Sequence, residues 1–95
     1  MIAELIYHEK KYYKDDAIKE IKIWRVPRTK DKPFGYKYSL VYIVRGERIV
    51  GYDNSEGKGD HRHFKEIEYP YKFQTLDKLW ADFETDIKNS KEDKS

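Results

Sequence analysis

The hydrophobic pattern of the first part of the chain is that of β-strands: strand-forming residues outnumber helix signals, and Ile21 and Ile23 share one strand face with Lys22 opposite. The segments Ile2 to Tyr13 and Ala17 to Val26 are both rich in strand-forming side chains. Between them, Lys14-Asp15-Asp16 is typical of a turn, because Asp side chains bond to nearby backbone groups. The pattern therefore predicts an antiparallel hairpin. It ends before Pro27, since proline cannot donate a hydrogen bond to a strand ladder.

The clearest strand is Tyr36 to Arg45. Its even-numbered residues are all apolar or tyrosine, and Val41 and Ile43 make the middle of the opposite face apolar as well. This pattern is typical of a central strand that is covered on both sides at its middle. Gly46-Glu47 predicts a tight turn, and Arg48 to Tyr52 predicts the strand that returns from it.

The remainder of the chain contains a polar loop, an extended segment and a helix. Asp53 to Asp60 is a polar loop, and His61 to Tyr69 is a single extended segment that ends at Pro70. From Thr75 to Ile87 the apolar residues recur at helical spacing and make one stripe, with Thr75 as the expected N-cap. Trp80 lies on this stripe, and we interpret both tryptophans, Trp24 and Trp80, as core residues.

These elements predict an α+β fold: a small antiparallel β-meander of four to five strands with one C-terminal helix packed on a face. Residues 1–88 form a single α+β domain, and residues 89–95 form a polar tail that is expected to fray. A chain of 95 residues supports one modest core and no more. Because so short a chain buries a small fraction of its surface and leaves strand edges open, we also expect a homodimer.

Composition narrows the class of protein. With 20 basic and 18 acidic residues the net charge is only +2, which argues against a nucleic-acid coat or a membrane-surface binder, although a local basic patch remains compatible. Cysteine is absent, and no apolar run reaches the length of a membrane span. The first residues lack a signal-peptide pattern, so we expect a cytoplasmic protein. Charged residues make up 40% of the chain, against about 25% in ordinary domains, which favours a thermophilic source.

Candidate chemistry is concentrated between residues 53 and 63. His61 and His63 are two residues apart, so in an extended chain their side chains point the same way and Arg62 points the opposite way. A loop of this length can turn the chain back antiparallel to the strand before it. We therefore predict that Asp53 or Asn54 lies within hydrogen-bonding distance of His61 or His63. The candidate site residues are Asp53, Asn54, Lys58, His61, Arg62 and His63.

Three interpretations of this region remain open. The first is phosphodiester chemistry, in which one histidine is the base and the other the acid, while Arg62, Lys58 or Arg48 holds the phosphate. The second is a metal site made by Asp53, His61 and His63, which we regard as the weaker alternative. The third is structural, with the acidic and amide side chains capping the loop backbone. We expect no cofactor and no metal.

Several stretches of the chain together match the pattern of a known group of small proteins. They are Met1-Ile2-Ala3-Glu4-Leu5 with His8, Ile23-Trp24-Arg25-Val26-Pro27, Gly35-Tyr36-Lys37-Tyr38, Glu47 to Asn54, Gly57 to His63, and Tyr69-Pro70-Tyr71-Lys72-Phe73. These stretches resemble the TumE-like family of small toxins from toxin–antitoxin pairs. The likeness extends from Met1 to about Ile87. Its most specific part is the Tyr-Asp-Asn…His-Arg-His block.

The resemblance implies a toxin whose partner is a helix-turn-helix-type antitoxin. The motif positions that it carries over are Asp53, Asn54, His61, Arg62 and His63, without a catalytic role attached to any of them. Our first hypothesis is a toxin that acts on RNA as a metal-independent ribonuclease. The alternative is a non-catalytic protein-binding module that works within a complex, for which nine tyrosines are suitable.

Overall fold

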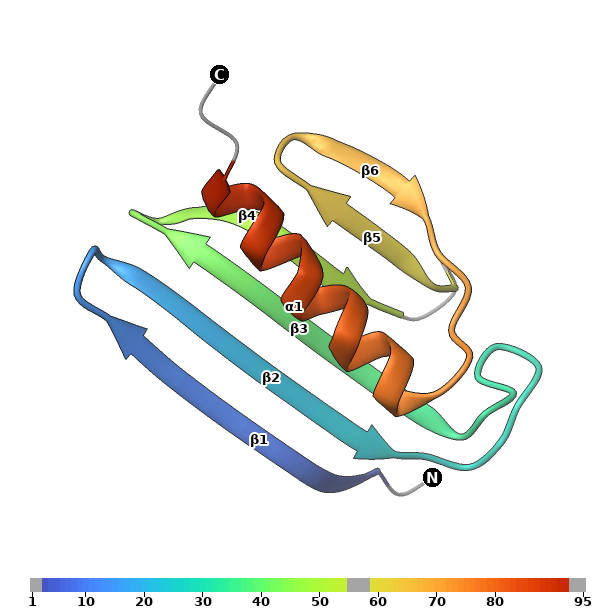
Figure 1. Cartoon of the computed structure of the whole chain (residues 1–95). Helices are drawn as coiled ribbons and strands as arrows, with labels where there is room; N and C mark the ends of the chain where they lie inside the picture. The colour runs from blue at the N-terminus through green and yellow to red at the C-terminus, as the bar shows by residue number, and fades with distance from the viewer. Residues whose placement is uncertain (1–2, 55–58, 93–95) are drawn as a thin grey trace.

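A single antiparallel sheet of six strands carries one helix on one face (Figure 1). The computed structural model describes residues 3–54 and 59–92. In order along the chain and across the sheet, the elements are β1 (Glu4–Tyr13), β2 (Ala17–Arg25), β3 (Tyr36–Val44), β4 (Glu47–Asp53), β5 (His61–Phe64) and β6 (Ile67–Pro70), followed by α1 (Leu76–Glu92). The α+β meander and the C-terminal helix are confirmed.

The expected count of four to five strands is wrong because the segment from His61 to Tyr69 is two strands. It folds back at Lys65, whose φ of 58° lies in the left-handed region. Phe64 then pairs with Ile67 across this turn, in the same sheet. No glycine, proline or asparagine marks the turn, so composition gives no signal for it.

The helix begins as predicted and ends later. The backbone N–H of Lys78 donates to Oγ1 of Thr75 at 3.0 Å, which is the N-cap bond expected of that residue. The helix ends at Glu92 rather than at Ile87, so residues 89–92 are helical, and residues 93–95 lie outside the described residues. Lys91 in the last turn lies where a cation opposes the negative end of the helix dipole.

The core lies between α1 and the strand residues that face it. It contains twelve buried hydrophobic residues: Ala17, Ile21, Ile23, Tyr38, Leu40, Tyr42, Val50, Tyr52, Phe73, Leu79, Phe83 and Ile87. Partly buried side chains, Trp80 among them, pack against this cluster. No helix of the described part of the chain is long and apolar enough to cross a membrane.

The opposite face of the sheet is covered by no described element (Figure 1). We call it the open face; among its residues are Lys22, Trp24, Lys37, Ser39, Arg48, Gly51, Asp53, His61, His63 and Glu68. Because Val41 and Ile43 lie here and are only partly buried, the expectation that β3 is covered on both sides is wrong. The expectation of a core position for Trp24 is also wrong: it is a partly buried residue that lies opposite to its buried neighbour Ile23.

Candidate functional site on the open face

Asp53, His61 and His63 meet where β4 and β5 pair. The register places Asp53 opposite His61 and Gly51 opposite His63, so the three candidate side chains, Asp53, His61 and His63, lie on the open face. Nε2 of His61 is 2.9 Å from Oδ1 of Asp53, and the two imidazole rings are edge to face with centroids 5.2 Å apart. The prediction that Asp53 or Asn54 lies within hydrogen-bonding distance of one of these histidines is confirmed.

The His61 ring has an acceptor at each of its nitrogens. Besides the Asp53 carboxylate at Nε2, the carbonyl oxygen of Gly59 is 3.3 Å from Nδ1. A doubly protonated imidazole donates from both nitrogens, whereas a neutral one donates from only one. Of the two contacts, the one at Nδ1 is the longer, and it is the one that a ligand oxygen would replace more readily.

A β-bulge brings Arg48 to the same site. Tyr42 pairs with Val50 but Ile43 pairs with Arg48, so β4 has one extra residue at this point and Arg48 changes face. The Arg48 side chain then lies across Gly51: a Cβ atom at residue 51 would be 3.0 Å from Cδ of Arg48 and 3.4 Å from its Nε. It would also be 3.7 Å from Cβ of His63. Glycine at this position leaves room for a guanidinium beside the histidines.

The electrostatics of His63 differ from those of an ordinary surface histidine. Partial burial lowers its pKa below the usual value of 6.5, and the nearby positive charge of Arg48 lowers the pKa further. Glu68, its cross-strand neighbour on β6, acts in the opposite direction with a smaller effect. His63 is therefore neutral at pH 7, with a nitrogen lone pair available to accept a proton.

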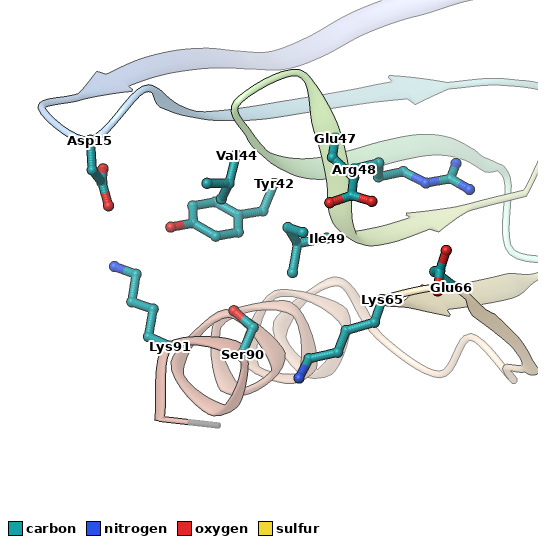
Figure 2. A pocket seen from close by; sticks show the side chains of 10 residues that line it. All are labelled: Asp15, Tyr42, Val44, Glu47, Arg48, Ile49, Lys65, Glu66, Ser90 and Lys91. Atoms are coloured by element: carbon teal, nitrogen blue, oxygen red, sulfur yellow. The ribbon is translucent and has the colours of Figure 1, made fainter. Parts of the chain in front are cut away.

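A pocket of about 640 Å³ lies on the other side of β4, near the end of α1. Figure 2 shows that the guanidinium of Arg48 points away from the other side chains that line it. Its charges are mixed, with lysines from the β5–β6 turn and from α1, and acidic residues from two turns and from the start of β4. The ten lining residues are Asp15, Tyr42, Val44, Glu47, Arg48, Ile49, Lys65, Glu66, Ser90 and Lys91. Arg48 is the lining residue that this hollow shares with the open-face site.

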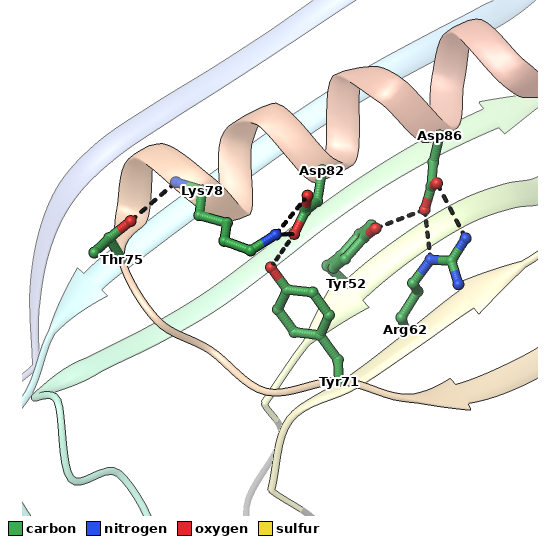
Figure 3. Close-up of polar contacts among 7 residues, drawn as sticks. All are labelled: Tyr52, Arg62, Tyr71, Thr75, Lys78, Asp82 and Asp86. Carbon is green, nitrogen blue, oxygen red and sulfur yellow. Dashed lines mark hydrogen bonds and ion pairs between the residues drawn. The ribbon is translucent and has the colours of Figure 1, made fainter.

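Arg62 lies on the side of the sheet that faces the helix, as the alternation of β5 predicts. Its Nε donates to Oδ2 of Asp86 at 2.6 Å and its second guanidinium nitrogen donates to Oδ1 at 3.0 Å, while the Tyr52 hydroxyl donates to Oδ2 at 2.6 Å (Figure 3). The bonds to Asp86 raise the pKa of Arg62, and burial, reinforced by Asp86, raises the pKa of Tyr52. The structure thus separates Arg62 from the two histidines beside it in the sequence.

Asn54 also points into the fold. It is 6% exposed, its Oδ1 accepts a hydrogen bond from the backbone N–H of Tyr38, and its Nδ2 donates to the carbonyl oxygen of Tyr36. These bonds fasten the end of β4 to the start of β3. Lys58 lies outside the described residues. Of the six candidates, the structure therefore brings together Asp53, His61 and His63.

These three residues also have the composition of a metal site. Each offers one ligand atom, and the three atoms lie within 4.8 Å of one another. Two imidazoles and one carboxylate suit divalent transition metals. However, the guanidinium of Arg48 adds a fixed positive charge beside His63, and a cation repels a second cation at short range. The same charge favours an anion.

The sequence did not single out Arg48 or Gly51. The sequence offers Arg62, Lys58 and Arg48 alike for phosphate binding, and only the bulge in β4 places Arg48 on the open face. A glycine inside a strand is a recognised signal of a bulge or of a close approach by another group. Gly51, three residues after Arg48, is therefore the feature by which the arrangement could have been found.

The fold and the site together define a small α+β protein that presents a carboxylate, two imidazoles and a guanidinium on an uncovered sheet face. The chain belongs to the TumE family, since the family model described as toxin TumE matches residues 2–91. Membership indicates a toxin role and an antitoxin partner. No curated protein and no solved structure matches the chain significantly.

Proposed function

We propose that this toxin cleaves RNA without a metal ion, through proton transfer by His61 and His63 on the open face. The observation that supports the proposal most directly is the juxtaposition of two imidazoles in different surroundings. One contacts a carboxylate and a carbonyl, and the other lies beside a guanidinium. Pairs of titratable groups whose environments differ in this way are suited to act as acid and base.

In the proposed reaction, His63 accepts the proton of a ribose 2′-hydroxyl. The 2′ oxygen attacks the adjacent phosphorus, and the bond from phosphorus to the 5′ oxygen of the next nucleotide breaks. His61 gives its proton to that leaving oxygen, so the products are a 2′,3′-cyclic phosphate and a free 5′-hydroxyl. Proton transfer by positioned side chains contributes about 10²–10⁴-fold to such reactions.

Arg48 is the residue that would bind the phosphate in this scheme. A guanidinium matches phosphate oxygens with two parallel donors and remains charged at every physiological pH. Its stem is held against Gly51, beside Cβ of His63, which would bring the scissile phosphate to the histidines. Charge that develops on the phosphate oxygens is then stabilised where it forms.

The other candidate residues have supporting roles in the proposal. Asp53 orients the His61 ring through Nε2, and Arg62 fastens β5 to the helix through Asp86. Asn54 holds the ends of β3 and β4 together. Lys58 remains a predicted second phosphate ligand. A cytoplasmic location is part of the proposal, since the substrate is cellular RNA.

Expression of the toxin without its antitoxin, with sequencing of cellular RNA, tests the proposal. We expect growth arrest and RNA fragments that begin with a 5′-hydroxyl, both lost in His61→Ala and His63→Ala. The third histidine provides the matched control: His8 lies on β1, bonded to Glu20 at 2.9 Å, so His8→Ala should stay toxic. Intact RNA in arrested cells would contradict the ribonuclease function.

The second candidate function is a protein-binding module, and strand β1 favours it. Four of the six exposed large hydrophobic side chains in the described residues lie on this edge strand: Leu5, Ile6, Tyr7 and Tyr12. A groove of about 380 Å³ runs beside it, lined mainly by apolar side chains of β1, β2 and α1. The other edge, β6, has four residues and ends in Pro70, which protects it from pairing.

An open edge of this kind is consistent with the proposed homodimer and with docking of an antitoxin, which we propose to be of the helix-turn-helix type. Light scattering should show a dimer, and a clean monomer at high concentration would contradict it. Co-expression of the neighbouring gene should suppress toxicity. If the double variant His61→Ala/His63→Ala keeps full toxicity, the binding module replaces the ribonuclease.

A further inference from the structure

Trp24 occupies a position that packing of the core does not explain. It lies on the open face of β2, is partly exposed, and is not a member of the buried cluster. Its cross-strand neighbour on β3 is Lys37, whose Nζ is 5.2 Å from the centre of the indole ring. Lys22, two residues before Trp24, lies on the same face. A large aromatic surface is thus placed among lysines.

A hollow of about 420 Å³ adjoins this tryptophan, with Lys37 as the residue shared between them. Three of its lining residues are apolar, Ala3, Val26 and Pro27. The rest are polar and include Lys32, whose Nζ is 2.6 Å from Asp31. An apolar wall with a few polar groups at its edge is the usual composition of a small-ligand site.

The strand register connects this corner to the histidine site. Lys22, Ser39, Asp53 and His61 form one continuous row across β2, β3, β4 and β5. The Trp24–Lys37 pair is the next position along β2 and β3 on the same face. Neighbouring strands are about 4.8 Å apart and rise about 3.3 Å per residue, so the Cα atoms of Lys37 and Asp53 are about 8 Å apart. Trp24 is about 12 Å from Asp53 by the same measure.

We propose that Trp24, Lys37 and the adjoining hollow form a base-binding subsite for single-stranded RNA whose phosphate is held at the histidines. The proposal rests on the proposed RNA-cleaving function and names the form of its substrate. Bases stack on aromatic side chains and lysines hold the backbone in single-strand sites, which contact about 4–16 nucleotides. The side chain between the two sites is Ser39, small enough to let a strand pass.

Fluorescence of Trp24 tests this subsite directly. The chain has two tryptophans, so Trp80→Phe leaves Trp24 as the sole source of tryptophan fluorescence. The probe is an oligonucleotide of about eight 2′-O-methyl nucleotides, which binds as single-stranded RNA does but lacks the attacking hydroxyl. We expect quenching of Trp24, and in the wild-type background a loss of affinity of about 5- to 150-fold for Trp24→Leu. Trp24→Phe should retain part of the affinity.

Lys37→Gln should weaken binding and reduce its salt dependence. Lys88→Gln, an exposed lysine on α1 and so on the other side of the sheet, is the matched control and should bind as the wild type does. Unquenched Trp24 together with wild-type affinity in Trp24→Leu would overturn the subsite, even if the protein cleaves RNA. Quenching by the probe in a protein that leaves RNA intact would support the subsite and remove the ribonuclease function.

Discussion

Replacement of Asp86 by alanine should test the role of Arg62 most sharply. The carboxylate is 8% exposed at its side chain, and it accepts two hydrogen bonds from Arg62 and one from Tyr52. Removing it leaves the Arg62 charge, 26% exposed, without this partner beneath the helix. Breaking a buried ion pair on one side costs about 3–5 kcal/mol. Because Arg62 is partly exposed and can turn toward water, we expect the lower end, about 3 kcal/mol.

For a domain of this size each kcal/mol corresponds to about 4–8 °C, so the melting temperature of Asp86→Ala should fall by about 12–24 °C. Denaturant unfolding followed by tryptophan fluorescence measures the free energy directly. The matched control is Asp82→Ala, four residues earlier on α1, whose partners are Tyr71 and the half-exposed Lys78 (Figure 3). It should cost about 1 kcal/mol.

A second substitution shows whether Asp86→Ala destabilises the protein by leaving the Arg62 charge unpaired or by disturbing the helix itself. Arg62→Met in the Asp86→Ala background removes the unpaired charge and keeps the apolar stem, so it should recover part of the lost stability. The stabilising role of Arg62 is contradicted by either of two results. Asp86→Ala could cost no more stability than Asp82→Ala, or Arg62→Met could destabilise the Asp86→Ala protein as much as it destabilises the wild type. Arg62 would then be available to bind a ligand.

Three further predictions concern the site and its supports. In Gly51→Ala the new methyl group displaces Arg48, so RNA cleavage should fall by about tenfold or more while denaturation shows no loss of stability, because glycine within a strand costs about 0.5–1 kcal/mol relative to alanine. The lowered pKa of His63 means that the base stays deprotonated below pH 6.5, so the acidic limb of the pH–rate profile should lie below that value. Arg48→Gln removes the repelling charge and should move this limb to higher pH. Asn54→Ala leaves the buried N–H of Tyr38 unpaired, and equilibrium unfolding should show a loss of about 2 kcal/mol.

The first four strands were predictable because strand-forming side chains recur along each of them and residues that favour turns lie at their ends. The last two strands were not, because each has four residues and the turn between them depends on the backbone of Lys65 adopting φ of 58°. The later end of α1 was missed for a related reason. Its last turns are polar, and polarity alone does not distinguish an exposed helix end from a tail.

The candidate site likewise has a part that local sequence predicts and a part that depends on distant residues. The spacing of His61 and His63 and the length of the loop were enough to place them beside Asp53, since strand geometry alone determines which side chains share a face. The role of Arg62 was not accessible, because its partner Asp86 is 24 residues away in the sequence and on a different element. The contribution of Arg48 depends on a bulge, which reverses the face that simple alternation assigns.

The ribonuclease function is tested most directly by cleavage of a defined RNA by the purified toxin in the presence of EDTA, with analysis of the product ends. We expect cleavage that chelation does not prevent, with 2′,3′-cyclic phosphate and 5′-hydroxyl ends, and its loss in His61→Ala and in His63→Ala but not in His8→Ala. Uncut RNA, cleavage that EDTA abolishes, or full activity in both histidine variants would contradict it.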